Sequence, residues 1–347
     1  MIQNDTFLKA LRRELTPHTP IWLMRQAGRY LPEYRHLRQQ AKDFLTLCKT
    51  PELACEITLQ PLARFPLDAA IIFSDILTIP DAMGLGLKFI EQTGPHFERP
   101  LRSAQAVQAL RKPDLNDLNY VFEAIQLTKQ ALADKVPLIG FSGSPWTLAT
   151  YMVEGGSSKT FSIIKKWLFN DPNSLSQLLE LLAETVTEYL LAQILAGADV
   201  VMLFDTWGGI LAAQDYQTFS LHYMNQIVKN IQQQKPTVPI ILFTKNGGQW
   251  LKQIAETGCD AIGLDWTTDI GLARAQVGQH VALQGNLDPA ALYADPLHVQ
   301  QQAKRILESY GNHPGHIFNL GHGIQPDTPV DHVAALVDFV HAWSPSV

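Results

Sequence analysis

The sequence predicts a (β/α)8 barrel of TIM type, formed by a single domain over residues 1–347. Short apolar segments occur eight times, helical patterns lie between them, and no segment rich in Pro, Gly or Ser divides the chain. Such nearly continuous apolar segments are typical of parallel strands covered on both faces by helices. A doubly wound open sheet is the alternative that the same alternation allows.

The eight predicted strands are short and rich in aliphatic and β-branched residues. In chain order they are 20–24, 69–74, 137–143, 199–205, 238–244, 260–266, 280–286 and 316–322. Active sites of (β/α)8 barrels lie at the C-terminal ends of the strands. The residues that follow each strand are therefore the first place to look for chemistry.

The predicted helices carry clear end signals. The clearest spans 172–196, where Asp171 is the N-cap, Pro172 takes the first helical position, and Gly197 follows the last turn. Leucines at helical spacing give this segment one apolar face. Further helix starts are predicted at Thr50-Pro51, Asp295-Pro296 and Thr328-Pro329, the last with Asp331 completing a capping box.

Composition narrows the functional class. The chain is 46% hydrophobic and 17% charged, as expected of a folded globule with a large core. A net charge of −6 argues against nucleic-acid binding. No apolar run is long enough to span a membrane and the N-terminus lacks a signal peptide, which predicts a cytoplasmic protein. The three cysteines lack CxxC spacing and are expected to be reduced.

Positive charge is concentrated near the N-terminus. Residues 1–38 hold seven Lys or Arg against three Asp or Glu, a net charge of +4, so the other residues carry −10. Arg25 and Arg29 are four apart, and a bound anion would relieve their repulsion if they shared a helical face. Gly28 would let backbone amides approach the same anion. Two solvated arginines are the alternative.

Single polar residues follow other strands, and each has a purely structural explanation as well. Asp75 is either a site residue or a turn residue, and His322 between two glycines has the same two explanations. Asp205 and Thr206 could cap the next helix, and Tyr151 could belong to the core. Patterns for nucleotide, metalloprotease or serine-hydrolase chemistry are absent from the sequence, and His313-x-x-His316 has no third metal ligand nearby. From these residues alone, the prediction stops at a barrel mouth suited to a carboxylate or phosphate.

Two long segments resemble the signatures of one enzyme family. Residues 20–35, PIWLMRQAGRYLPEYR, resemble the N-terminal signature of uroporphyrinogen decarboxylases, and residues 140–156, GFSGSPWTLATYMVEGG, resemble a second signature. The similarity continues in order through AAIIFSDILTIPDAMGL, LFDTWGG, FTKNGG, GLDW, LQGNLDP and FNLGHGI. It covers nearly the whole chain.

The resemblance implies cofactor-independent decarboxylation of the four acetates of uroporphyrinogen III to methyl groups, which gives coproporphyrinogen III. No cofactor or metal is expected, and the family implies a homodimer. The substrate-binding residues that it implies are Arg25, Gln26, Ala27, Gly28, Arg29, Asp75, Tyr151, Thr206 and His322. Asp75 is expected to stabilise positive charge on the pyrrole, with Arg25 or Arg29 at the reacting acetate and His322 as the alternative proton donor.

Some positions stay open after this comparison. The LFDTWGG loop differs from the FESHAG form of some members, which leaves the role of Asp205 undecided. Arg35 and Arg38 either line the cleft or lie on a solvated helix face. Related zinc-dependent methyltransferases carry His-x-Cys where this chain has Thr244-Lys245-Asn246, so that activity is not expected. A tetrapyrrole carrier without turnover is the remaining alternative.

Overall fold

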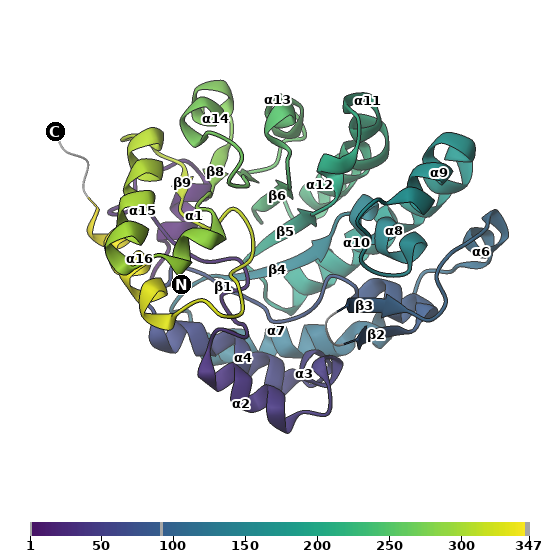
Figure 1. The fold of residues 1–347 in the computed structure, drawn as a ribbon, viewed down its shortest axis with the longest axis horizontal. Helices are drawn as coiled ribbons and strands as arrows, with labels where there is room; N and C mark the ends of the chain where they lie inside the picture. Colours follow the sequence, from purple (N-terminus) through teal and green to yellow (C-terminus); the bar gives the residue numbers. More distant parts are fainter. Residues whose placement is uncertain (1, 91–92, 344–347) are drawn as a thin grey trace.

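A curled sheet of seven parallel strands forms the centre of the protein, seen in a computed structural model that describes residues 2–90 and 93–343 (Figure 1). Its order is β1-β4-β5-β6-β7-β8-β9. The strands are β1 (Ala70–Ile71), β4 (Leu138–Gly143), β5 (Val200–Asp205), β6 (Ile240–Thr244), β7 (Ala261–Gly263), β8 (Ala282–Gln284) and β9 (His316–Ile317). Neighbours in the sheet follow one another along the chain without a reversal, which excludes the doubly wound alternative.

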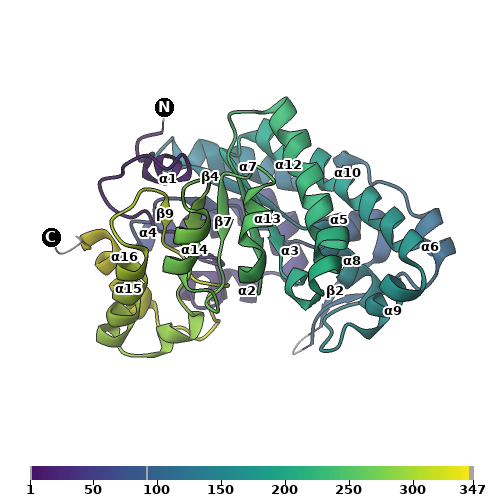
Figure 2. The same ribbon diagram turned by 90° about the horizontal axis from the view of Figure 1, so that it is seen from above.

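Helices connect the strands and cover the outside of the sheet (Figures 1 and 2). The α-helices are α1 (Thr6–Leu11), α2 (Pro32–Gln40), α3 (Phe44–Lys49), α4 (Pro51–Arg64), α5 (Thr78–Pro80), α6 (Ala104–Ala109), α7 (Asn119–Leu132), α8 (Pro145–Glu154), α9 (Ser162–Asn170), α10 (Pro172–Ala196), α11 (Ala213–Tyr216), α12 (His222–Gln234), α13 (Leu251–Ala255), α14 (Ile270–Val277), α15 (Pro296–Tyr310) and α16 (Val330–Ala342). Short 3₁₀ or π segments are η1 (Asp81–Leu85), η2 (Leu115–Leu118), η3 (Gly208–Ile210), η4 (Gln217–Leu221), η5 (Gly248–Trp250) and η6 (Pro289–Tyr293). Strands β2 (Leu87–Ile90) and β3 (Gly94–Phe97) form a separate antiparallel pair. No helix in the described part of the chain has the length and apolar character needed to cross a bilayer.

The helix ends follow the sequence signals where the caps are local. Helix α10 spans the predicted 172–196, and the Asp171 side chain accepts a hydrogen bond from the Ser174 N–H at 3.2 Å. The predicted helix start at Thr328-Pro329, with a capping box completed by Asp331, was wrong. Helix α16 begins at Val330, its N-cap is Pro329, and no side chain caps it.

The predicted strand 20–24 is reduced to one β-bridge, between Ile21 and Phe318. Side chains take the N–H groups that a ladder would need. Ile21 donates to Asp68 Oδ2 at 2.7 Å, Leu23 to Gln26 Oε1 at 3.0 Å, and Met24 to Asn319 Oδ1 at 2.9 Å. The segment still lies between β9 and the residues before β1, since Asp68 N–H donates to the Ile21 carbonyl at 2.9 Å.

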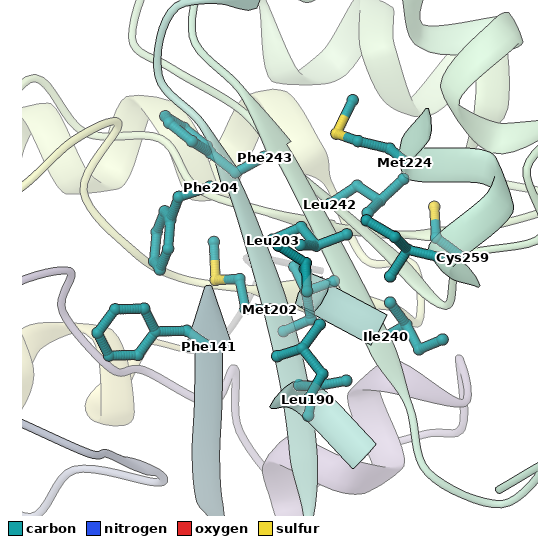
Figure 3. Packing of buried hydrophobic residues seen from close by; sticks show 14 of the residues in the cluster. Phe141, Leu190, Met202, Leu203, Phe204, Met224, Ile240, Leu242, Phe243 and Cys259 are labelled. Atoms are coloured by element: carbon teal, nitrogen blue, oxygen red, sulfur yellow. The ribbon is translucent and has the colours of Figure 1, made fainter. Parts of the chain in front are cut away.

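Alternation along the strands separates the two faces of the sheet. Phe204 pairs with Phe243 in the register of β5 and β6, and their ring centroids are 6.1 Å apart. Phe141 of β4 lies 5.6 Å from Phe204, and Figure 3 shows these three rings on one side of the strands. Leu203 and Leu242 point to the other side, toward Met224 of α12 (Figure 3). The residues that continue the Phe204 and Phe243 alternation therefore face the inside of the curled sheet.

Candidate active site

Most predicted site residues gather at the C-terminal ends of the strands. Asp75 follows β1 and His322 follows β9, while Tyr151 lies in α8 after β4. Arg25 acts electrostatically on all three groups, so the four side chains share one region. Thr206 directly follows β5, is half-buried, and forms no hydrogen bond with the described residues.

The Arg25 backbone adopts a left-handed conformation, with φ of 63°. Such conformations are costly for residues other than glycine and occur often at functional sites. Its side chain packs on Gly323, where an added Cβ would meet Arg25 Cδ. The glycine that follows His322 therefore leaves room for the position that Arg25 takes over that loop.

Gln26 is fully buried and makes only internal hydrogen bonds. Its amide accepts from the Leu23 N–H at 3.0 Å and donates to the Ala69 carbonyl at 3.1 Å. Its own carbonyl accepts the Tyr30 hydroxyl at 2.8 Å. These bonds join the arginine loop to the chain before β1, so Gln26 shapes the loop.

The next three residues present free backbone donors. No described residue accepts a hydrogen bond from the N–H groups of Ala27, Gly28 and Arg29. Both Arg25 and Arg29 are exposed. Three consecutive free amides beside two exposed arginines are suited to binding a carboxylate.

Asp75 holds one carboxylate oxygen in place and leaves the other free. Oδ1 accepts the Leu77 N–H at 2.8 Å. Burial raises the pKa of Asp75, while that hydrogen bond and the charge of Arg25 work in the opposite direction. The carboxylate is thus fixed next to a cation, with its second oxygen free to accept a hydrogen bond from a ligand.

Tyr151 and His322 are both partly buried beside this carboxylate. Burial raises the pKa of Tyr151, and its ring lies 6.1 Å from that of Trp207. Burial, followed by the charges of Arg25 and Lys245, lowers the pKa of His322 to about 3. His322 is therefore neutral near neutral pH.

Asp205, whose role the sequence left open, is a buried structural residue that accepts hydrogen bonds from several neighbouring elements. It has 0% exposure, and its two oxygens accept four hydroxyls, from Ser144 at 2.6 Å, Thr147 at 3.1 Å, Ser220 at 2.7 Å and Thr244 at 3.3 Å. Burial raises its pKa and these bonds oppose the shift. Asp205 faces away from the inside of the sheet and connects β5 to the helices around it.

The two further arginines of the N-terminal segment lie on α2. Arg35 is exposed, whereas Arg38 is half-buried. Arg38 acts electrostatically on Tyr34 and Asp43, and Arg29 also acts on Tyr34. Arg38 and Arg29 therefore both lie near Tyr34.

Lys245 was not predicted as a site residue, although the FTKNGG motif places it after a strand. It is half-buried, its Nζ lies 5.6 Å from the centroid of the Trp266 ring, and it contributes to the low pKa of His322. A lysine directly after an apolar strand was the signal available in the sequence.

A second polar cluster lies at the opposite, N-terminal end of the strands. Asp68 is 1% exposed and accepts hydrogen bonds from His18 at 3.1 Å and His341 at 2.8 Å, and also from Ile21 N–H and the Asn4 amide. Burial would raise the pKa of Asp68, but these bonds outweigh it and hold the pKa well below its ordinary value. One atom each of His18, Asp68 and His341 lies within 4.8 Å of the other two, a spacing that could suit a metal ion. Both Asp68 oxygens already accept two hydrogen bonds each, however. The cluster therefore connects the N-terminal segment to α16.

The pair His313 and His316 does not form a metal site. His316 is buried, stacks on Tyr310 with centroids 4.3 Å apart, and has its Nε2 3.1 Å from the Gly285 carbonyl. Burial lowers its pKa to about 4. It is a satisfied core histidine.

Comparisons with known proteins agree with the resemblance. The family described as uroporphyrinogen decarboxylase (URO-D) matches residues 2–343. The uroporphyrinogen decarboxylase of Tolumonas auensis is 62% identical, with 99% of this chain and 98% of the relative covered, and that of Nitrosococcus oceani is 61% identical, with 99% and 97% covered. A methyltransferase structure from Methanosarcina mazei has a TM-score of 0.79 at 20% identity over 97% of both chains, which shows a shared fold.

Proposed function

Because the chain belongs to the uroporphyrinogen decarboxylase family, we propose that it decarboxylates the four acetates of uroporphyrinogen III to give coproporphyrinogen III and four CO2 in haem biosynthesis. The observation that supports this best is the Asp75 carboxylate, which lies within electrostatic reach of Arg25 and has one oxygen held by Leu77 N–H and the other free. A polyanionic substrate also needs local positive charge, which the arginine loop supplies on an acidic chain.

Carboxylate binding is assigned to the arginine loop. Arg25 and Arg29 carry planar forks that bind carboxylates through two parallel hydrogen bonds. Between them, the N–H groups of Ala27 and Gly28 are free to donate to the same group. In this proposal Gln26 contributes by holding the loop, while Tyr151, Thr206 and His322 contact the bound tetrapyrrole.

The chemical difficulty is the electron pair left when the bond to CO2 breaks. A pyrrole protonated on carbon accepts that pair, so the substrate itself is the electron sink. Asp75 would accept hydrogen bonds from the pyrrole N–H groups and stabilise positive charge on the ring as it develops. A preorganised group of this kind is typically worth a few kcal/mol in the transition state.

The proton donor is assigned to an arginine at the reacting acetate, relayed by the substrate carboxylate. A guanidinium is a poor acid in water, so this role needs a site from which the bound substrate excludes water. Because its pKa is lowered to about 3, His322 is almost entirely neutral at pH 7, which suits a binding role better than that of a proton donor.

The remaining parts of the proposal concern architecture. We propose that residues 1–347 form one domain and that 20–24 takes the eighth place of a closed barrel, which the Ile21–Phe318 bridge supports. We also propose a homodimer, which the family resemblance implies, and a location in the cytoplasm. Light scattering on the purified protein and fractionation of the host cell test these two points.

One experiment tests the reaction. The purified protein is incubated anaerobically with uroporphyrinogen, with and without a chelator, and the products are separated by chromatography. Coproporphyrinogen in both samples supports the proposal. Activity only without chelator would overturn the metal-free mechanism, and tight binding without product would indicate a carrier.

A further inference from the structure

Lys245 occupies the position beside Thr206 at the inner edge of the sheet. Asp205 pairs with Thr244 in the register of β5 and β6, so Thr206 and Lys245 form the next pair. The Lys245 N–H donates to the Asp205 carbonyl at 3.2 Å, which continues the ladder by one step. By alternation Lys245 follows Phe243, whose ring faces the inside of the curled sheet (Figure 3).

The ammonium group of Lys245 carries a charge that no described residue neutralises. Within residues 2–90 and 93–343, no carboxylate lies at ion-pair distance from its Nζ. The nearby Asp265 is buried, and its oxygens accept hydrogen bonds from Asn246 and Thr267 instead. The ammonium group lies over the face of the Trp266 ring, and Trp266 is 39% exposed.

A half-buried ammonium group without a charged partner is unfavourable unless a ligand supplies the opposite charge. The contact with Trp266 restricts the flexible side chain and leaves the outer N–H groups of the ammonium free. Asp75 does not pair with it, because β1 and β6 are separated by β4 and β5 in the sheet. Lys245 is therefore separated from Asp75 by two strands of the sheet, while its charge still acts on His322.

We propose that Lys245 is a further substrate-binding residue that holds a non-reacting carboxylate of the tetrapyrrole, with Trp266 as its positioning residue. The inference rests on the proposed function for the identity of the substrate. A carboxylate bound away from the reacting acetate is held equally in the ground state and the transition state. Its loss should raise KM and leave kcat nearly unchanged.

Lys245→Met removes the charge and keeps most of the side-chain volume. We expect KM for uroporphyrinogen to rise about tenfold, as for the loss of one charge-assisted contact, with kcat within about threefold of the wild type. Lys245→Arg should restore most of the affinity, and Trp266→Leu should raise KM by a smaller factor. Lys252→Met, an exposed lysine on α13, is the matched control and should change neither constant.

Two further measurements separate binding from structure and from turnover. Binding of the oxidised porphyrin with the same eight carboxylates, followed by tryptophan quenching, should weaken about tenfold in Lys245→Met and lose part of its salt dependence. The His322 imidazole, titrated by NMR, should move to higher pKa in this variant and not in Lys252→Met, because one of two nearby cations is gone.

The outcomes are distinct. Wild-type protein that binds the porphyrin without forming coproporphyrinogen would refute the proposed reaction, while weaker binding by Lys245→Met would still support the lysine contact. Unchanged KM and unchanged porphyrin affinity in a folded Lys245→Met would overturn the inference. A fall in kcat equal to the rise in KM, rescued by neither salt nor arginine, would assign Lys245 a structural role instead.

Discussion

Asp75→Asn is the most informative substitution in the proposed site. The asparagine carbonyl oxygen can keep the hydrogen bond that Asp75 Oδ1 accepts from Leu77 N–H at 2.8 Å. The change therefore keeps the shape of the turn and removes the negative charge. At the free oxygen it replaces an acceptor with an NH2 donor, which cannot accept a pyrrole N–H.

The expected magnitude follows from the proposed role. Losing one preorganised group that stabilises transition-state charge costs about 10²–10³ in kcat, or roughly 3–4 kcal/mol. Stability should behave in the opposite way. Burial raises the pKa of Asp75, so the folded protein disfavours its charged form, and the neutral amide should leave the melting temperature unchanged or higher.

The assay is the rate of coproporphyrinogen formation under anaerobic conditions, together with a thermal melt. Asp114→Asn is the matched control, since Asp114 Oδ1 accepts from Asn116 N–H at 2.9 Å in a similar turn on the exposed surface. It should leave the rate unchanged. Turnover by Asp75→Asn within about threefold of the wild type would refute the electrostatic role.

Three further predictions concern other residues. Arg25→Lys and Arg29→Lys should each slow single-turnover decarboxylation at least about tenfold, because lysine lacks the bidentate fork, and His322→Asn should cost less; near-total loss confined to His322→Asn would reverse the assignment. Asp205→Ala should lower the free energy of unfolding by about 3 kcal/mol in urea titrations, since four buried hydroxyls lose their acceptor, and a loss below about 1 kcal/mol would show that they find other partners. Asp68→Asn should destabilise the protein at pH 7. Because the folded pKa of Asp68 is lowered, its contribution is fully present above the unfolded value near 3.8 and is lost as pH falls from there through the folded value. The difference in stability from the wild type should therefore begin to narrow below about pH 3.8. A difference that stays constant from pH 7 to pH 3 would contradict the prediction.

Local sequence patterns predicted the features that depend on neighbouring residues. Helix α10 spans the predicted 172–196 because each of its end signals acts within one turn of its own helix end. These signals are Asp171 and Pro172 at the start and Gly197 at the end. The order of strands along the sheet also followed from alternation of short apolar segments and helices. The same positions after the strands, together with the family motifs, identified Asp75 and the arginine loop as site candidates.

What the sequence could not predict depends on partners that are distant in the chain. Segment 20–24 is apolar like a strand, yet Asp68 and Asn319 take two of its N–H groups, so its ladder is reduced to one bridge. The role of Asp205 stayed undecided until its four buried hydroxyl partners identified it as a structural residue. The role of Lys245 could be inferred only from the structure, where its ammonium group contacts Trp266 and no described carboxylate lies at ion-pair distance.

One physical cause separates the features that the sequence predicted from those that only the structure showed. Caps, helical faces and strand composition act between residues a few positions apart, so the sequence by itself determined the alternation of elements and the loops where chemistry would lie. Hydrogen-bond partners, burial and the resulting pKa shifts depend on which distant side chains meet, as when His341 reaches Asp68 or Arg25 packs on Gly323. Only the tertiary structure decided which charged groups are used internally and which remain free for a ligand.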